Sequence, residues 1–106
     1  MMNQVVTSLS FRIISSVGTA RSKYIEAIQQ ARKGKISEAK SCMKEGTTIF
    51  LDGHRAHAEL IALAGKEPFD IDLLLMHAED QLMGAENFKI VAEEFIYLYE
   101  QLEFKI

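Results

Sequence analysis

Apolar residues recur at intervals of three and four along almost the whole chain, and they do not alternate with polar residues as in a half-exposed strand. In the first third of the chain this spacing forms one stripe, made of Val6, Leu9, Ile13, Val17, Ala20, Tyr24, Ile28 and Ala31. No stretch shows a convincing strand pattern. The sequence therefore predicts an all-α protein.

Strong helix-breaking residues occur at two places, Lys33-Gly34-Lys35 and Gly65-Lys66-Glu67-Pro68. The glycine of each stretch is expected just beyond the end of a helix, and Pro68 fits shortly after such an end. Ser37 is a candidate N-cap for the next helix, and Asp70 or Asp72 for the one after.

These breaks leave three helical segments, at about 4–33, 37–64 and 71–103. Each would be about 45 Å long, and the short connections favour antiparallel neighbours. We therefore predict an antiparallel up-down three-helix bundle that forms a single domain over residues 1–106. Gly46 and Gly53 lie seven residues apart on one helix face, which is typical of close helix packing.

The chain has 106 residues, of which 48% are hydrophobic. A chain of this length buries only about 60 to 65% of its unfolded surface. The third segment is apolar on more than one face, so a lone bundle would leave much apolar surface in water. We expect the chain to self-associate.

Composition and charge exclude several classes of protein. The formal net charge is −3 and no basic block is present, which argues against nucleic-acid binding through phosphate neutralisation. No apolar run approaches the roughly 18 residues of a membrane span, and no secretory leader is visible. Cys42 is the single cysteine, so it cannot form an internal disulfide; Lys40 and Lys44 could lower its pKa, although a half-buried apolar role is favoured. The expected location is the cytoplasm.

The most informative residues for chemistry are His77 and Asp80, which share a helix face at i, i+3. Their stripe is apolar at both ends, which is unusual for a charged pair. The two residues could form a local ion pair, or the imidazole could act as a nucleophile beside an orienting acid, or both could bind a metal.

His54 and His57 are also spaced i, i+3, on the second predicted helix. A helical metal-binding protein that uses them with His77 and Asp80 is one alternative, although the chain lacks the Glu-x-x-His motifs of di-iron bundles. A helical adaptor without catalysis, in which His77 and Asp80 merely pair, is the other. The C-terminal aromatic and aliphatic run is expected in the core or at a subunit interface.

Three stretches resemble one family closely. Gly18-Thr19-Ala20-Arg21-Ser22 followed by Glu26-Ala27-Ile28, then Asp52-Gly53-His54, and above all Met76-His77-Ala78-Glu79-Asp80-Gln81-Leu82-Met83 carry the likeness. They resemble the IIA components of the lactose/cellobiose (diacetylchitobiose) branch of the bacterial phosphoenolpyruvate-dependent sugar phosphotransferase system.

The resemblance implies a three-helix unit that trimerises into a nine-helix bundle. It implies that His77 is the phosphoryl acceptor, at its tele nitrogen, receiving the group from the phosphocarrier HPr and passing it to a cysteine of the IIB component. It also implies that Asp80 meets its two symmetry mates at the trimer axis around a divalent cation, commonly Mg²⁺. Oxygen ligands suit that ion, and a cation would relieve the repulsion of three carboxylates.

Two positions of the last motif carry further expectations. Glu79 stands where the family has Gln, and a carboxylate there would repel a phosphoryl group on His77 unless Glu79 turns away or is protonated. On that basis we expect Glu79→Gln to raise phosphoryl acceptance. Gln81 is similar to the residue of the cellobiose and chitobiose types, whereas lactose types carry His there, so a β-linked disaccharide of the former kind is preferred.

Overall fold

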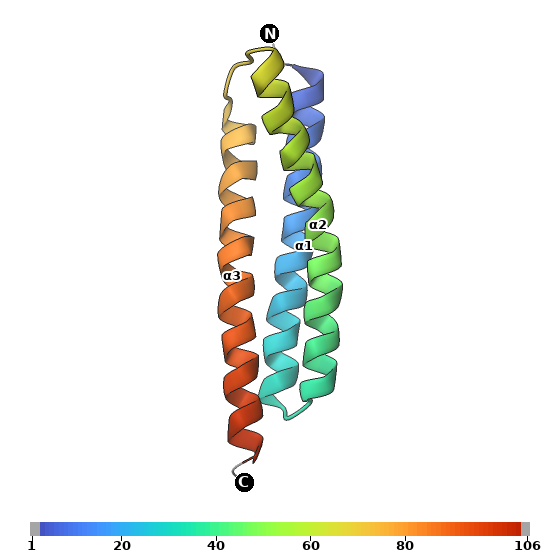
Figure 1. Ribbon diagram of the computed structural model, residues 1–106, viewed down its shortest axis with the longest axis vertical. Helices are drawn as coiled ribbons and strands as arrows, with labels where there is room; N and C mark the ends of the chain where they lie inside the picture. The colour runs from blue at the N-terminus through green and yellow to red at the C-terminus, as the bar shows by residue number, and fades with distance from the viewer. Residues whose placement is uncertain (1–2, 105–106) are drawn as a thin grey trace.

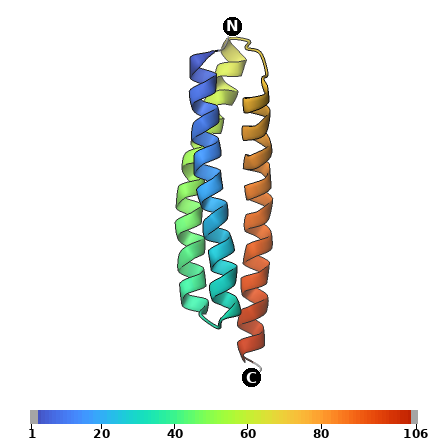
Figure 2. The ribbon, with the colours of Figure 1, turned by 180° about the vertical axis from the view of Figure 1, so that it is seen from behind.

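The computed structural model describes residues 3–104, and these form three helices, each antiparallel to the one before it. Helix α1 spans Gln4–Arg32, α2 spans Ile36–Lys66 and α3 spans Leu73–Phe104. They lie side by side in a rod of about 60 × 19 × 16 Å, and the described chain contains no strand (Figures 1 and 2). The predicted all-α class and the three-helix order are confirmed, with helix ends within two residues of those expected.

The helix ends show which local signals the chain uses. Asn3 caps α1, because its side-chain oxygen accepts hydrogen bonds from the backbone N–H groups of Val5 and Val6. Gly34 has a φ of 82°, the left-handed conformation that ends α1. Of the two aspartates considered for α3, Asp72 is the cap: its Oδ1 accepts from the backbone N–H of Leu75 at 2.8 Å.

Two predicted ends were wrong by a residue or two. Ser37 is not a cap, because α2 already begins at Ile36 and its cap residue makes no side-chain hydrogen bond. Gly65 is inside α2, which continues through Lys66. The helix stops there because Glu67, which precedes Pro68, is forced into an extended conformation with φ −144° and ψ 114°.

Helix α1 is the central element of the packing. Both α2 and α3 pack closely against it, whereas α2 and α3 contact each other much less. The predicted α1 stripe faces this core, with Ile13, Val17 and Tyr24 almost completely buried and Ile28 at its margin. The rod is therefore two tight helix pairs that share α1, and not three equal contacts.

The two glycines in the middle of α2 allow it to lie close to α1. A Cβ atom on Gly46 would come within 2.7 Å of the ring of Tyr24, and one on Gly53 within 2.9 Å of Val17 Cγ1. Real Cβ atoms do not approach other carbons so closely, so no larger residue fits at either position without movement. The predicted packing role of Gly46 and Gly53 is confirmed.

Helix α3 has an unusual distribution of side-chain sizes. The face that it turns to the core carries several small residues, among them Ala78, Ala85 and Ala92. Its large exposed hydrophobic residues are Leu73, Met76, Met83, Ile90, Val91, Phe95, Tyr97, Leu98 and Leu102. Leu73 alone is 82% exposed. A contiguous apolar surface of this kind marks an interaction site.

Candidate functional site

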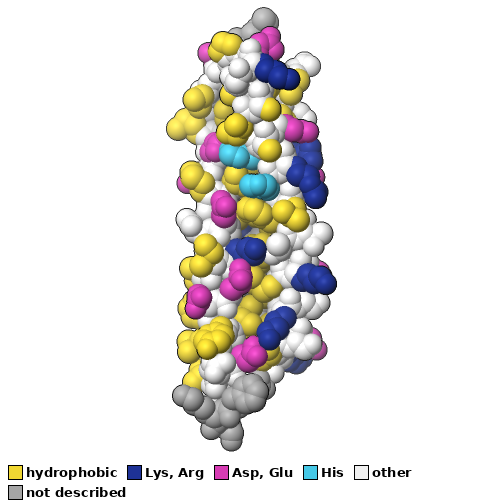
Figure 3. Space-filling view, viewed as in Figure 1, with side chains coloured by type: hydrophobic (Ala, Val, Ile, Leu, Met, Phe, Trp, Pro, Cys, Tyr) yellow, Lys and Arg dark blue, Asp and Glu magenta, His cyan; other side chains and the backbone are white. Residues whose placement is uncertain are grey.

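The N-terminal half of α3 carries His77 and Asp80 on its outer side. Leu75, Ala78 and Leu82 anchor this half in the core, while Met76, His77 and Asp80 face outward. On the face shown in Figure 3, histidine side chains gather in the upper half of the molecule among hydrophobic and acidic side chains. The helix therefore presents a rigidly placed imidazole to solvent.

The side chains of His77 and Asp80 are exposed, and within residues 3–104 neither makes a hydrogen bond or an ion pair. The local His77–Asp80 ion pair that their spacing permits is not formed. Both ring nitrogens of His77 and both carboxylate oxygens of Asp80 are consequently available to a group from outside the chain.

Glu79 points to a different side of α3 from His77. Residues i and i+2 of a helix do not face each other. Both carboxylate oxygens of Glu79 lie 2.9 Å from Nε2 of His57 on α2. Of the two ways in which Glu79 was expected to avoid a phosphoryl group on His77, the structure shows that it is turned toward α2.

The histidines do not assemble a metal centre within one chain. The ring of His54 stacks on Phe50 with its centroid 6.4 Å away, while His57 is engaged by Glu79. Across the described part of the chain, no three His, Cys, Asp or Glu side chains are placed to hold a metal ion. The arrangement gives no support to the alternative in which His54, His57, His77 and Asp80 converge.

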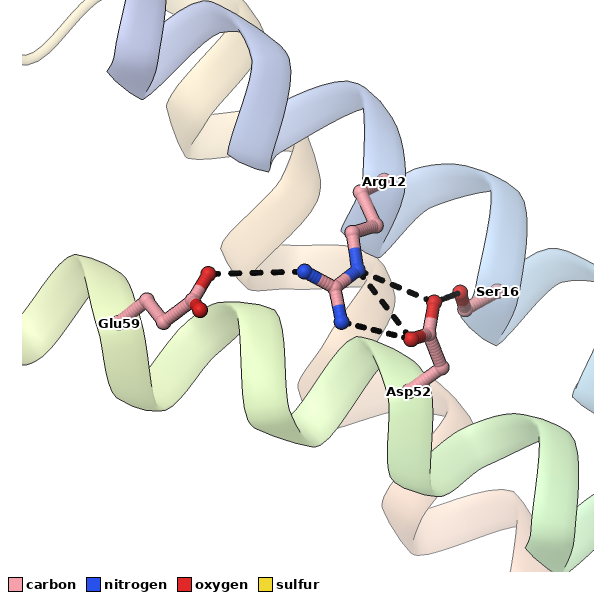
Figure 4. A network of polar contacts seen from close by, with 4 residues as sticks. All are labelled: Arg12, Ser16, Asp52 and Glu59. Carbon is pink, nitrogen blue, oxygen red and sulfur yellow. Dashed lines mark hydrogen bonds and ion pairs between the residues drawn. The ribbon is translucent and has the colours of Figure 1, made fainter.

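A second polar network joins α1 to α2 (Figure 4). The Arg12 guanidinium approaches Asp52 to 2.7 Å and Glu59 to 3.5 Å, and Ser16 donates a hydrogen bond of 2.9 Å to Asp52. The hydrogen bonds from Arg12 and Ser16 lower the pKa of Asp52 to about 2. This network links the two helices at their surface, and Asp52 of the second motif is part of it.

Arg21 and Cys42, two further residues considered from the sequence, contact other parts of the bundle or are partly buried in it. The guanidinium of Arg21 lies 5.7 Å from the ring centre of Phe88 on α3, a cation–π contact between helices. Cys42 is half-buried, and burial with the nearby carboxylates of Glu26 and Glu45 raises its pKa. The neighbouring lysines of α2 therefore do not activate this thiol.

Comparison with known proteins decides the family. Residues 8–100 match the family model described as "PTS system, Lactose/Cellobiose specific IIA subunit". The chain belongs to this family. Its fold agrees: a crystal structure of the PTS cellobiose-specific enzyme IIA from Bacillus anthracis superimposes with a TM-score of 0.93 and 39% identity, over 100% of this chain and 97% of that one.

Curated relatives place the chain among phosphotransferase components. The lichenan-specific phosphotransferase enzyme IIA component of Bacillus subtilis is 36% identical, over 95% of this chain and 93% of its own length. The lactose-specific EIIA component of Streptococcus mutans is 29% identical, over 95% and 98%. This IIA subunit is thus a sugar-specific phosphocarrier that works with a IIB component and a phosphocarrier protein. None of its described helices is long and apolar enough to cross a membrane.

Sequence reasoning missed two cross-helix contacts of this IIA subunit, His57–Glu79 and Arg12–Asp52. In an antiparallel helix pair, residues at similar distances before and after the connection lie side by side. His57 precedes the 67–72 connection by about as much as Glu79 follows it, so this rule was a usable signal. For Arg12 and Asp52 the charges were visible in the sequence, but the helix faces that bring them together were not.

Proposed function

We propose that this IIA subunit accepts a phosphoryl group from phosphorylated HPr on His77 and passes it to a cysteine of the IIB component. The proposal rests on one observation: His77 lies in the family's most specific motif, on a rigid helix, with an exposed imidazole that no other described residue engages. Phosphoryl transfer depends mainly on positioning and charge stabilisation, which a side chain held in this way provides.

The reaction follows from the imidazole alone. The lone pair of an unprotonated ring nitrogen, expected to be the tele nitrogen, forms a bond to phosphorus while the bond from phosphorus to the HPr imidazole breaks. In the second step the thiolate of the IIB cysteine attacks phosphorus, and the bond to His77 breaks. The attacking ring nitrogen must carry its lone pair, so His77 reacts as the neutral imidazole.

The sugar is proposed to be a β-linked disaccharide of the cellobiose or chitobiose type. Gln81 supports it, and the similar proteins are named for cellobiose and lichenan as well as lactose. The IIA subunit does not bind the sugar in this scheme, so the choice belongs to its IIB partner and the membrane component.

We also propose that the exposed apolar face of α3 forms a homotrimer, with Asp80 of each subunit at its axis. Large apolar residues flank Asp80 on that face, among them Met76 and Met83. Asp80 offers a carboxylate, the ligand class that Mg²⁺ prefers, but among the described residues of one chain no three potential ligands gather to hold an ion. The donor set therefore fits Mg²⁺ only when several copies meet; when bound, the ion would neutralise their charge.

Phosphorylation read by intact mass tests the central proposal. Phosphoenolpyruvate, enzyme I and HPr are expected to add one acid-labile phosphoryl group to the wild-type protein and none to His77→Ala. His54→Ala is the matched control, because His54 is also exposed but lies on α2. Equal phosphorylation of the His77→Ala variant, or none of the wild type beside charged HPr, would refute the assignment.

Sedimentation tests the placement of Asp80. Asp80→Leu is expected to keep or strengthen the trimer, because it removes the repulsion among carboxylates, and to abolish binding of the divalent cation. Asp70→Leu, an exposed acid outside α3, should change neither property. Dissociation of Asp80→Leu into stable monomers would contradict an axial position.

A further inference from the structure

The contact between His57 and Glu79 is the feature that the proposed phosphoryl transfer leaves unexplained. Nε2 of His57 lies 2.9 Å from each carboxylate oxygen of Glu79, so a single ring N–H faces both oxygens. The side chains are 22% and 38% exposed, which places the contact at the edge of the core. A hydrogen bond to a carboxylate in partly buried surroundings is stronger than one between neutral groups in water.

This contact holds the acceptor-bearing half of α3 to α2. The two helices otherwise touch little, and the other ion pair between them in the described residues, Lys40–Glu100, lies toward the opposite end of the bundle. Among the described residues, His57 is therefore the polar partner of Glu79 on α2. Without His57, its carboxylate would be free to rotate around three side-chain bonds.

The position of that carboxylate matters for a phosphoryl group on His77. Glu79 is two residues from the acceptor, and a phosphoryl group carries about two negative charges near neutral pH. A loose carboxylate in that neighbourhood raises the free energy of the phosphorylated state by Coulomb repulsion. A carboxylate that is held against α2 by an N–H donor is both farther away and partly neutralised.

We propose that His57 is a positioning residue: it holds the Glu79 carboxylate against α2 and so keeps its negative charge away from the phosphoryl group that His77 accepts. This inference rests on the proposed phosphocarrier function. It assigns a role to a histidine that neither receives the phosphoryl group nor binds a metal.

Three variants, compared with wild type, separate the charge effect from a general loss of structure. Phosphoryl acceptance from HPr is measured as initial rate and as level at equilibrium. His57→Ala is expected to lower the rate by about three- to tenfold, the effect of one imperfectly screened charge. Because His57 already holds the Glu79 carboxylate against α2, Glu79→Gln alone should be close to wild type, and not above it as the motif alone predicts. The double variant His57→Ala/Glu79→Gln should recover the rate, because no charge remains to be held.

Three further comparisons make the test specific. His57→Gln keeps an N–H donor toward Glu79 and should lie close to wild type. The His57→Ala defect should shrink as ionic strength rises, since salt screens exposed charges. Lys40→Ala, which removes the other ion pair between α2 and α3, should leave the rate unchanged. Circular dichroism monitors folding, and if His57→Ala does not fold, His57→Leu alone and with Glu79→Gln replaces it.

The outcomes distinguish the two proposals. A normal rate in His57→Ala, or a slow rate that Glu79→Gln does not restore, overturns the role of His57 and leaves the phosphocarrier function intact. A wild-type protein that takes no phosphoryl group overturns both proposals. A slow single variant that is restored in the double variant supports the role of His57.

Discussion

Between α1 and α2 the backbones lie so close that a methyl group would not fit at Gly46, whereas a groove of about 620 Å³ lies between α2 and α3. We call the α1–α2 contact the first seam and the α2–α3 contact the second seam. In the first seam, Arg12 and Ser16 of α1 also donate hydrogen bonds to Asp52 of α2. The second seam is bridged at its two ends by His57–Glu79 and Lys40–Glu100. The α1–α2 contact is closely packed, whereas the α2–α3 contact leaves a groove beside α3.

The difference separates the part of the bundle that provides stability from the helix that carries the candidate site. The α1–α2 pair behaves as a rigid hairpin, because glycines, a buried tyrosine and a charged network fix it. Helix α3 is anchored to this hairpin through α1, and it carries His77, Asp80 and the exposed apolar face. Stability should therefore be most sensitive to changes between α1 and α2, and phosphoryl transfer to changes on the exposed side of α3 and at the His57–Glu79 contact.

The largest effect on stability is expected from filling the first seam. Gly46→Ala places a Cβ atom 2.7 Å from a carbon of the fully buried Tyr24 ring, so the ring or the helices must shift. Overpacking of this kind lowers the free energy of unfolding by about 1 to 3 kcal/mol, partly offset by the better helix propensity of alanine. Urea unfolding at one fixed protein concentration measures it.

Gly65→Ala is the matched control, because Gly65 lies in the same helix and, beyond its chain neighbours and the local helix backbone, no described atom lies within 4 Å of its Cβ position. It should raise the free energy of unfolding, by at most about 1 kcal/mol. If both alanines stabilise the protein, α1 and α2 are free to separate slightly, and the comparison of the two seams fails.

A smaller effect, confined to acid, is expected at Asp52. Its pKa is lowered to about 2 from an ordinary value near 3.9, so the folded state favours the ionised form. That contribution is complete above pH 4 and is lost as the pH falls toward 2. Asp52→Asn should therefore flatten the decline in stability between pH 4 and 2, which denaturant unfolding at a series of pH values measures.

Ser16→Ala should have a smaller effect than Asp52→Asn, because the hydrogen bond from Arg12 lowers the pKa of Asp52 more than the one from Ser16 does. It should retain most of the acid dependence that Asp52→Asn removes. An identical acid limb in wild type and Asp52→Asn would show that the network contributes nothing to the first seam.

The smallest effect is expected at the far end of the second seam. Lys40→Ala removes the 2.9 Å contact with Glu100, but the lysine side chain is 59% exposed. Exposed ion pairs contribute at most about 1 kcal/mol to folding. A change in melting temperature as large as that of Gly46→Ala would mean that the α2–α3 seam is held much more firmly than its open groove indicates.

Most of the fold was predictable because its signals are local. Hydrophobic spacing fixed the helices, and Gly34, Pro68 and Asp72 acted through backbone conformation and capping over a few residues. The errors at Ser37 and Gly65 are also local: a good cap residue or a glycine permits a helix to end without requiring it. The packing role of Gly46 and Gly53 followed from their shared face.

The site was less accessible to sequence reasoning. Its motif pointed to His77 and Asp80, and the structure places both on the exposed side of one helix. The surroundings of Glu79 could not be read from the motif, because the partner is on another helix and depends on the register between α2 and α3. Spacing along one helix indicates which residues share a face, but it does not indicate what that face meets.

Helix α3 has small residues on its core face and large apolar residues on its exposed face, and this distribution affects where the protein can be labelled. One side of α3 is lined with alanines against α1, and the other carries the apolar face, His77 and Asp80, so a dye or crosslinker on this helix would disturb one of them. Gln29 and Ser37 are exposed near the α1–α2 connection, at the end of the rod opposite the 67–72 connection (Figure 1). Cysteines introduced there, in a background that lacks Cys42, would carry a label at the end of the rod away from the N-terminal half of α3.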